Sequence, residues 1–308
     1  MIFMKFRRLI LFCSILALFS ACSQKNANSI IDDSKEYFSN FSGSVSYLGP
    51  KGTYTQEAAQ KFFGENAKFI ASKTVSDAVL SVINQTCTFA VIPQENTIGG
   101  PVYDYLDELL KYENLFIFGE VELPIRQALL AKEGTELSSI KTVYSHKQGL
   151  IQGKDWLEKN IPGVQLVEVS STAKGAEIVS ASYEKDCAAI ASSAACGVYG
   201  LTVLQKDVQQ NENNKTRFYI LSAKEPFTER KERMVFVATG NAENLLKLTD
   251  SLSKNKFSLV SIHARPAKTT LGEYKYLIEC KNAGYDDFKK IASFEKFAFR
   301  YAGSFCVE

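Results

Sequence analysis

The stretch that most constrains the fold is Asn211-Glu212-Asn213-Asn214-Lys215-Thr216-Arg217-Phe218-Tyr219-Ile220-Leu221. A polar run here enters a short apolar strand, so Thr216 and Arg217 are expected where a loop meets a sheet. The planar guanidinium of Arg217 suits a carboxylate, and the Thr216 hydroxyl is able to donate to a neighbouring oxygen. Thr216 and Arg217 together therefore predict a binding site for a small acidic molecule. An ordinary strand entry with a surface arginine is the alternative.

Length and composition indicate a globular protein of two domains. The chain has 308 residues, 45% of them hydrophobic, which is enough to bury at least one sizeable core. Its 36 Lys and Arg residues against 34 Asp and Glu residues give a net charge of +2, with both signs mixed along the chain. This balance predicts no nucleic-acid partner.

Residues 1–22 have the pattern of an export signal. Three basic residues precede the apolar run Leu9 to Phe19, which is short for a membrane span and suits a signal-peptide core. Ala21 and Cys22 then resemble the lipobox of bacterial lipoproteins, which implies a lipidated Cys22 as the only membrane attachment. An uncleaved anchor or a mistaken start codon are the alternatives.

The body of the chain gives conflicting evidence on localisation. Residues 23–43 are rich in Ser, Asn, Asp and Lys and predict a solvated tether. The body then carries an odd number of cysteines without paired spacing, which is typical of a reducing compartment: Cys87, Cys187, Cys196, Cys280 and Cys306. No Cys/His cluster has metal-ligand spacing, so no metal site is predicted. The signal favours an exported, anchored lipoprotein, and a cytoplasmic protein is the alternative.

From Ser44 onward one unit recurs, consisting of a short apolar strand, a polar turn and an amphipathic helix. The first unit predicts Thr55 as the N-cap of a helix, and the second leads through Gly99-Gly100 into a helix with Pro101 in its first turn. Three further strands of this kind are Lys141 to Ser145, Leu166 to Val169 and Cys187 to Ala191. The alternation predicts an α/β fold with a mainly parallel sheet.

Parallel sheets bind ligands beyond the carboxyl ends of their strands, where these polar turns lie. Helix N-termini at Gly99-Gly100 and Ser171-Thr172 would expose backbone N–H groups that favour a carboxylate or phosphate. Plain helix caps are the simpler interpretation of any one turn. Five such turns at one rim favour an anion-binding cleft.

The pattern changes after a charged linker at residues 224–231. The predicted elements are a strand at Met234 to Ala238, a helix at Ala242 to Ser253, strands at Leu259 to Ala264 and Tyr274 to Cys280, a helix at Tyr285 to Phe294 and a strand at Phe297 to Ala302. This βαββαβ order is the ferredoxin-like arrangement of small regulatory modules.

Several motifs, taken in order over Ser44 to Glu308, resemble the prephenate dehydratases and the related plant arogenate dehydratases. The matching segments are Tyr47-Leu48-Gly49-Pro50-Lys51-Gly52-Thr53, Ile92-Pro93-Gln94-Glu95-Asn96-Thr97-Ile98-Gly99-Gly100, Leu123-Pro124-Ile125, Tyr144-Ser145-His146, Ser171-Thr172-Ala173-Lys174, Tyr199-Gly200-Leu201 and the signature Thr216-Arg217-Phe218. Each segment is short, but the ordered set is specific.

The resemblance implies a lyase of L-phenylalanine biosynthesis that converts prephenate to phenylpyruvate, carbon dioxide and water without a cofactor. It implies a two-lobed catalytic domain like the periplasmic solute-binding proteins over residues 44–226. It also implies a C-terminal ACT domain over residues 232–308 that binds phenylalanine. The family is usually dimeric or tetrameric, so a homodimer or homotetramer is expected.

The resemblance also implies residue roles. Thr216 would donate to the leaving oxygen. Glu95 would be either the acid behind that donor or a group that orients others, and the second role is favoured because a bare carboxylate repels a dianionic substrate. The implied substrate-binding residues are Thr53, Asn96, Thr97, Gly99, Gly100, Ser171, Thr172, Asn214, Arg217 and Phe218. His146 is interpreted as a lining residue, and Gln127 stands where the family often has His.

In the C-terminal module the family's Glu-Ser-Arg-Pro segment corresponds to His263-Ala264-Arg265-Pro266, so only its last two positions are kept. The residues expected at the phenylalanine site are Asn241, Ala242, Leu245, His263 and Arg265. These departures predict an ACT fold with altered or lost phenylalanine control.

Three alternatives to a prephenate dehydratase stay open. The substrate of the same chemistry could be arogenate. The chain could be a lipid-anchored solute-binding protein without catalysis, or an inactive relative that senses an aromatic acid. The Thr-Arg-Phe signature and the C-terminal module favour the enzyme, because transport receptors need neither.

Overall fold

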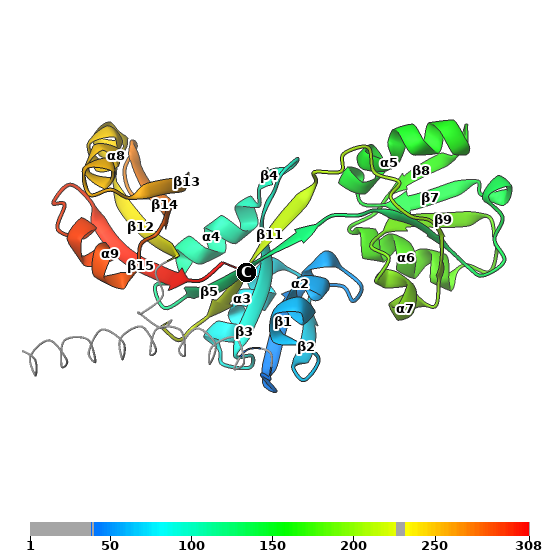
Figure 1. Cartoon of the computed structure of the whole chain (residues 1–308), viewed down its shortest axis with the longest axis horizontal. Coiled ribbons are helices and arrows are strands. Elements are labelled where there is room, and N and C mark those ends of the chain that lie inside the picture. Colours follow the sequence, from blue (N-terminus) through cyan, green and yellow to red (C-terminus); the bar gives the residue numbers. More distant parts are fainter. Residues whose placement is uncertain (1–37, 39, 226–231, 308) are drawn as a thin grey trace, which may run out of the picture.

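The computed structural model describes residues 38, 40–225 and 232–307, whose strands form three sheets (Figure 1). The predicted export signal, Cys22 and most of the predicted tether lie outside the described residues. None of the helices in the described part of the chain is long and apolar enough to cross a membrane.

The first lobe is built on a six-stranded sheet in the order β2-β1-β3-β11-β5, with β4 paired to β3. Its strands are β1 (Ser44–Leu48), β2 (Lys68–Ser72), β3 (Phe89–Asn96), β4 (Gly100–Pro101), β5 (Phe116–Pro124) and β11 (Lys215–Ser222). Its helices are α2 (Tyr54–Phe63), α3 (Val75–Ile83) and α4 (Tyr103–Lys111). β1 is parallel to β2 and β3, whereas β11 is antiparallel to β3 and β5.

The second lobe is built on a five-stranded sheet in the order β10-β6-β9-β7-β8. Its strands are β6 (Ala128–Ala131), β7 (Thr142–Ser145), β8 (Gln165–Glu168), β9 (Cys187–Ala191) and β10 (Thr202–Gln205). Its helices are η1 (Leu137–Ser139), α5 (Lys147–Asn160), α6 (Thr172–Ala181) and α7 (Ala195–Tyr199). β7 is parallel to β8 and β9, and β6 is antiparallel to β9 and β10.

The chain passes between the two lobes twice, from β5 to β6 and back from β10 to β11 (Figure 1). The returning strand enters the first sheet against the direction of its neighbours β3 and β5. The predicted α/β class is therefore confirmed, but the prediction of a mainly parallel sheet is wrong. Local strand and helix patterns do not reveal the direction in which a strand returns from another lobe.

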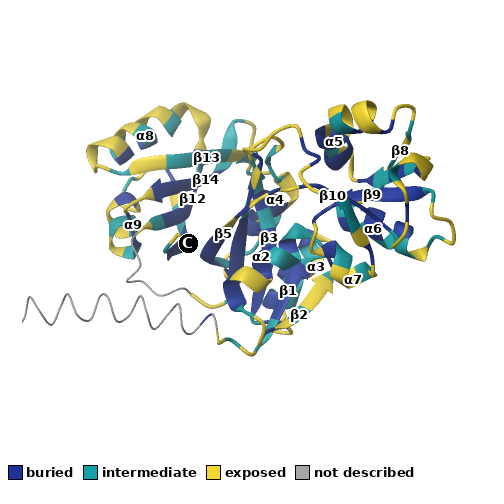
Figure 2. Ribbon diagram, turned by 45° about the vertical axis from the view of Figure 1, so that its right-hand side comes forward, coloured by how far each residue is buried: buried dark blue, intermediate teal, exposed yellow. Residues whose placement is uncertain are grey.

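The third sheet has the order β13-β14-β12-β15. The module comprises β12 (Arg233–Asn241), η2 (Ala242–Asn244), α8 (Leu245–Lys254), β13 (Ser258–Pro266), β14 (Glu273–Lys281), α9 (Tyr285–Ile291) and β15 (Ala298–Phe305). The predicted βαββαβ order is confirmed. Figure 2 shows exposed residues along α8 and on the edge strand β2, whereas β12 and the strands β1, β3, β5 and β11 of the first sheet are largely buried.

One apolar core joins the C-terminal module to the first lobe. Val235 of β12 and Phe305 of β15 belong to the same buried cluster as Ile117 of β5 and Tyr219 of β11. Burial of apolar area stabilises a contact by about 25 cal/mol per Å² removed from water. A shared core of this kind holds the module against the lobe.

Cations of the module also hold the C-terminal end of α4. The Arg300 guanidinium donates to the carbonyls of Leu109, at 2.9 Å, and Leu115, at 3.2 Å. Lys275 Nζ donates to the Leu110 carbonyl at 3.0 Å. Unpaired carbonyls at a helix C-terminus attract positive charge, so α4 and the module stabilise one another.

Two predicted helix starts are wrong. The N-cap of α2 is Thr53, whose Oγ1 accepts from the Gln56 N–H, and Thr55 is buried within the first turn. α4 begins at Tyr103, because Gly100 and Pro101 first pair with β3 as the short strand β4. Gly99-Gly100 therefore do not form a helix N-terminus.

The end of the predicted tether is not solvated. Phe38 is only 4% exposed and packs its ring against Phe62 and Phe89, with centroids 5.0 Å and 5.8 Å apart. Phe41 packs against Phe63 at 5.4 Å. Two aromatic residues within a polar run show no periodicity, so only the folded chain reveals that the core of the first lobe includes them.

The closest approach of the module to the first lobe yields a prediction at Gly303. This residue has φ +141°, and a Cβ there would overlap the carbonyl oxygen of Ile117 on β5. Gly303→Ala should lower the free energy of unfolding by at least about 2 kcal/mol, through backbone strain and overpacking. Thermal denaturation measures the change.

Gly197→Ala on α7, where a Cβ meets nothing within 4 Å, is the matched control and should leave the melting temperature near that of the wild type. Equal melting temperatures for both variants would contradict the prediction.

Candidate active site

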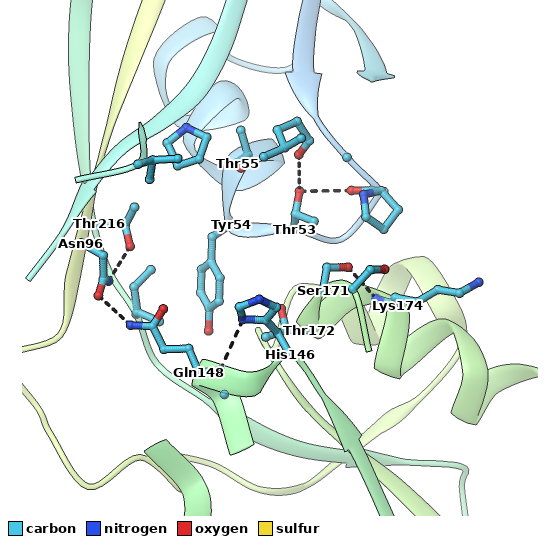
Figure 3. Close-up of a pocket in the computed structure, with 18 of the residues that line it drawn as sticks. Thr53, Tyr54, Thr55, Asn96, His146, Gln148, Ser171, Thr172, Lys174 and Thr216 are labelled. Carbon is cyan, nitrogen blue, oxygen red and sulfur yellow. Dashed lines mark hydrogen bonds between the residues drawn. The ribbon is translucent and has the colours of Figure 1, made fainter. Parts of the chain in front are cut away.

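A pocket of about 670 Å³ lies between the two lobes, a volume that suits a small organic molecule. The first lobe contributes the turn after β1, the end of β3 and the start of β11, and the second lobe contributes the N-termini of α5 and α6. Thr216, Asn96 and Ser171 all line it. Figure 3 shows Thr216 and Asn96 on one side of this pocket and Ser171 on the other, with Tyr54 and His146 between them.

Asn96 is the centre of a hydrogen-bond network that orients Thr216. Its Oδ1 accepts from the backbone N–H groups of Ile98 and Gly99, at 3.0 and 2.9 Å, and from Gln148 Nε2 at 2.9 Å. Because backbone N–H groups only donate, these bonds determine which way the amide faces. Asn96 Nδ2 therefore donates to Thr216 Oγ1, at 2.9 Å (Figure 3).

This network fixes the direction in which the Thr216 hydroxyl can donate its proton. A threonine hydroxyl has one proton to donate and two lone pairs to accept with. The Asn96 amide occupies one lone pair of Thr216, so the proton of this hydroxyl stays available to a molecule in the pocket.

Asn214 offers a second donor to the pocket. Its Oδ1 accepts from Asn96 Nδ2 at 2.8 Å, whereas its own Nδ2 is buried without a hydrogen-bond partner. Asn214 is 1% exposed and lines the pocket. A buried unpaired donor costs about 1–3 kcal/mol, and a ligand oxygen at this point would recover that cost.

The N-terminus of α6 faces the pocket from the second lobe. Ser171 is its N-cap and accepts from the Lys174 N–H at 3.0 Å. Ser171, Thr172 and the Lys174 side chain all line the pocket, and Lys174 Nζ lies 3.0 Å from Glu177. Glu177 lines the pocket as well and neutralises this ammonium group, so the helix dipole is what favours an anion here, and the anion site at Ser171-Thr172 stays a prediction.

The remaining polar lining residues come from both lobes. His146 is the N-cap of α5, and its Nδ1 accepts from the Gln148 N–H at 3.3 Å, so the neutral ring carries its proton on Nε2. Gln127 is buried and donates to Gln152 Oε1 at 3.1 Å. Thr53 donates to the Pro50 carbonyl at 3.1 Å and lines the pocket beside Phe218, which lies on β11.

Arg217 points away from the pocket. Side chains alternate along a strand, so Arg217 lies on the opposite face of β11 from Thr216. Its guanidinium donates to Gln94, Glu95 and Glu279, at 2.9, 3.2 and 3.0 Å. The prediction that Arg217 and Thr216 grip one molecule together does not agree with this placement.

Three further predicted residues surround the pocket without lining it. Thr97 Oγ1 accepts from the Lys215 N–H at 3.0 Å, and the Gly99 N–H binds Asn96. Gly100 begins β4 with φ +73°, directly after the turn that follows β3. These residues shape the loop that holds Asn96.

The sequence analysis did not identify Gln148 and Lys174 as lining residues of the pocket, or Asp107 as the partner of Arg265. Gln148 and Lys174 lie in the first turns of α5 and α6, directly after polar turns that were identified. Their positions directly after those polar turns are the sequence feature that could have identified them as lining residues. Asp107 has no such feature, because its partner Arg265 lies 158 residues later in the chain.

The five residues expected at a phenylalanine site lie in the C-terminal module: Asn241 ends β12, Ala242 lies in η2, Leu245 begins α8, and His263 and Arg265 lie on β13. Arg265 makes a two-pronged ion pair with Asp107 of α4, at 2.6 and 2.7 Å. It also lies over the ring of Tyr103, 5.3 Å from its centroid. Burial lowers the pKa of His263, against the opposing attraction of Glu95. These two side chains therefore belong to the junction between module and lobe.

A buried ionic cluster fills that junction. It contains three carboxylates, Glu95, Glu120 and Glu279, and two guanidinium groups, Arg217 and Arg233. Burial, with repulsion from Glu279, raises the pKa of Glu120 to about 7, although both guanidinium groups oppose the rise. Below about pH 7 a proton on Glu120 thus offsets the excess negative charge of the cluster.

The two lobes joined by two crossing segments, with a pocket lined by both of them, define the class of two-lobed α/β proteins with a pocket of small-molecule size between their lobes. Residues 45–226 match the family model for prephenate dehydratase. Since this match covers more than half of the chain, the protein belongs to the prephenate dehydratase family.

Relatives and solved structures agree with this assignment. The chain is 35% identical over 237 residues to a bifunctional chorismate mutase/prephenate dehydratase of Aquifex aeolicus, a match that covers 76% of this chain but only 64% of that protein. It is 30% identical over 256 residues to the prephenate dehydratase of Bacillus subtilis, covering 79% and 90%. The structure of an Arthrobacter aurescens prephenate dehydratase in complex with L-Phe superposes with a TM-score of 0.77 at 27% identity, covering 85% of this chain and 90% of that one.

The ionic cluster yields a pH prediction. Because the folded chain raises the pKa of Glu120 from 4.5 to about 7, it holds a proton that the unfolded chain releases between these pH values. Stability should therefore fall as the pH rises through this window, by at most about 1.4 kcal/mol per pH unit. Glu120→Gln cannot ionise. It should match the wild type near pH 4.5 and exceed its melting temperature above pH 7.

Thermal denaturation between about pH 4 and about pH 8 tests this dependence. Glu122→Gln, two residues further along β5 and half exposed, is the matched control and should show no such divergence. If the melting temperatures of Glu120→Gln and the wild type differ by the same amount at every pH, the proton does not belong to Glu120.

Proposed function

We propose that the chain is a lyase that converts prephenate to phenylpyruvate, carbon dioxide and water in L-phenylalanine biosynthesis. The observation that carries this proposal is the Thr216 hydroxyl, which accepts from Asn96 and has its proton free for the pocket. Membership of the prephenate dehydratase family supports it. The chain spans about two thirds of the length of the bifunctional relatives, so their mutase activity is not proposed for it.

The chemistry requires a donor at the leaving hydroxyl and a good orientation of the ring. As the bond to the carboxylate carbon breaks, its electron pair enters the ring, and the hydroxyl at the opposite ring position leaves with its bonding pair. Thr216 donates a hydrogen bond to the departing oxygen, which leaves as hydroxide and takes a proton from solvent to become water. Aromatisation supplies the driving force, so orientation and one donor are sufficient without any cofactor.

The carboxylates of the substrate need partners other than Arg217. The N-terminus of α6, with Ser171, Thr172 and Lys174, supplies one anion site. The free Nδ2 of Asn214 and the Nε2 proton of His146 supply further donors. Glu95 is assigned the orienting role, because its carboxylate is paired with Arg217 outside the pocket lining.

The division into a catalytic domain, residues 44–226, and an ACT domain, residues 232–308, stays part of the proposal. The two lobes would then be those of a periplasmic-binding-protein-like domain. The βαββαβ order and the sheet order β13-β14-β12-β15 support a ferredoxin-like module of the ACT kind. A homodimer or homotetramer is expected, and analytical ultracentrifugation would test it.

The N-terminal anchor stays a prediction as well. Lipidation at Cys22 should place the chain in the membrane fraction of its cells, and Cys22→Ser should move it to the soluble fraction. Fractionation of cells that express each tagged chain tests the exported form against the cytoplasmic alternative.

Altered control by phenylalanine is proposed for this chain. Arg265, which the family motif keeps, is committed to Asp107, and His263 faces the ionic cluster. Isothermal titration of the purified chain with phenylalanine should give no binding in the micromolar range. Heats that fit a micromolar dissociation constant would contradict this proposal and restore ordinary feedback inhibition.

The catalytic proposal predicts the effect of removing the hydroxyl. Thr216→Ala should lower kcat for prephenate by about a hundredfold or more, because the leaving oxygen loses its donor. Thr216→Ser keeps the hydroxyl and should keep much of the activity. Formation of phenylpyruvate, followed by its absorbance, measures both rates.

The same assay separates the alternatives. Turnover of arogenate in preference to prephenate would make the chain an arogenate dehydratase. Binding of prephenate without turnover would indicate an inactive sensor or a solute-binding protein. Equal kcat values for Thr216→Ala and the wild type would exclude Thr216 as the donor.

A further inference from the structure

Glu279 lies in the middle of β14, in the C-terminal module, and reaches the strand that carries Thr216. It is 1% exposed. Its Oε1 accepts from Arg217 Nη1 at 3.0 Å, and its Oε2 accepts from the Tyr219 hydroxyl at 2.8 Å. Arg233 Nε, from β12 of the module, lies 3.0 Å from the same Oε1 but without hydrogen-bond geometry.

Both hydrogen-bond donors belong to β11, and they alternate with the residues of the pocket. Thr216 and Phe218 line the pocket, while Arg217 and Tyr219 face the module. One carboxylate therefore contacts β11 on the two positions that flank Phe218.

The backbone pairing of β11 is irregular at this point. Its register with β3 shifts between Arg217 and Phe218, so the backbone ladder is interrupted one residue after Thr216. A bulge re-aims nearby side chains, and here only the pairing with β5 continues without a shift, from Lys215 to Ile220. The side-chain contacts of Arg217 and Tyr219 then contribute to the position of this segment.

The groups on β11 need this acceptor. Burial, with the nearby charge of Glu279, raises the pKa of Tyr219 well above its ordinary value, so its hydroxyl keeps its proton and donates. A buried hydroxyl or guanidinium that loses its partner is strongly destabilised where it stands and moves to find another. For Arg217 the nearest other carboxylates are Glu95 and Glu120, in the first lobe itself.

We propose that Glu279 is a positioning residue for the active site, which holds β11 through Arg217 and Tyr219 so that Thr216 meets Asn96 and the pocket. The C-terminal module thereby contributes to the geometry of the site even without an effector. The catalytic part of this inference rests on the proposed function, whereas the effect on β11 does not.

The variants Glu279→Gln and Asp107→Asn form a matched pair. In each variant an amide of the same size takes the place of a carboxylate. Each of these carboxylates pairs with an arginine across the junction of module and lobe. Asp107 binds Arg265 on β13, whereas only Glu279 contacts β11. If the loss of any ion pair across the junction is enough to change kcat or the exchange rates, both variants should show the change.

Two measurements are made on the full chain without phenylalanine. Glu279→Gln should lower kcat for prephenate by about tenfold or more with KM within about twofold, since misplacement of a reacting group by an ångström costs up to about a hundredfold. Asp107→Asn should leave both constants within about twofold. Hydrogen–deuterium exchange should be faster at the β11 amides in Glu279→Gln only.

Tyr219→Phe provides a variant that leaves no charge unpaired. It removes one of the two bonds from β11 to Glu279, and it should lower kcat in the same direction by a smaller factor. If Glu279→Gln does not fold, the kcat and the exchange rates of Tyr219→Phe decide whether Glu279 positions β11.

The proposal is overturned if Glu279→Gln and Asp107→Asn have equal kcat values and equal exchange at β11, or if Tyr219→Phe changes neither quantity. Absence of turnover in the wild type would reject the proposed function instead. The exchange data would then still decide whether Glu279 holds β11.

Discussion

The alternation of side chains along β11 is the constraint on which the site depends. Successive residues of a strand point to opposite faces, so the same strand lines the pocket with Thr216 and Phe218 and faces the C-terminal module with Arg217 and Tyr219. A change of one residue in register would exchange these two sets and remove the hydroxyl from the pocket. The backbone pairing of β11 with β3 and β5 therefore supports both the site and the junction.

The junction explains why the Arg217 guanidinium, next in sequence to the proposed catalytic hydroxyl, does not line the pocket. Arg217 is surrounded by Glu95, Glu120 and Glu279, and the last two of these carboxylates are buried. Loss of one partner from a buried pair costs about 3–5 kcal/mol, which is a large share of the stability of a domain. Arg217 thus links the lobe and the module, and the N-terminus of α6 faces the pocket in its place.

The pocket itself relies on amide groups for its geometry. The Asn96 amide receives two backbone N–H groups and Gln148 on one side and donates to Thr216 and Asn214 on the other. Since Gln148 belongs to the second lobe, this network crosses the pocket and ties the separation of the lobes to the orientation of the hydroxyl. A neutral network of this kind orients a donor without placing a negative charge beside an anionic ligand.

The sequence by itself determined the recurring units of strand, turn and helix, the βαββαβ order of the module and several residues of the pocket lining, because hydrophobic periodicity, polar turns and short motifs are local signals. Thr216, Asn96, Ser171 and Asn214 were all found in this way. Only the tertiary structure decided that β11 runs antiparallel to its neighbours, that Arg217 faces Glu279 and that Arg265 meets Asp107. These features depend on pairs of residues 62 and 158 positions apart, and no local pattern encodes which distant carboxylate a given arginine will reach once the chain has folded.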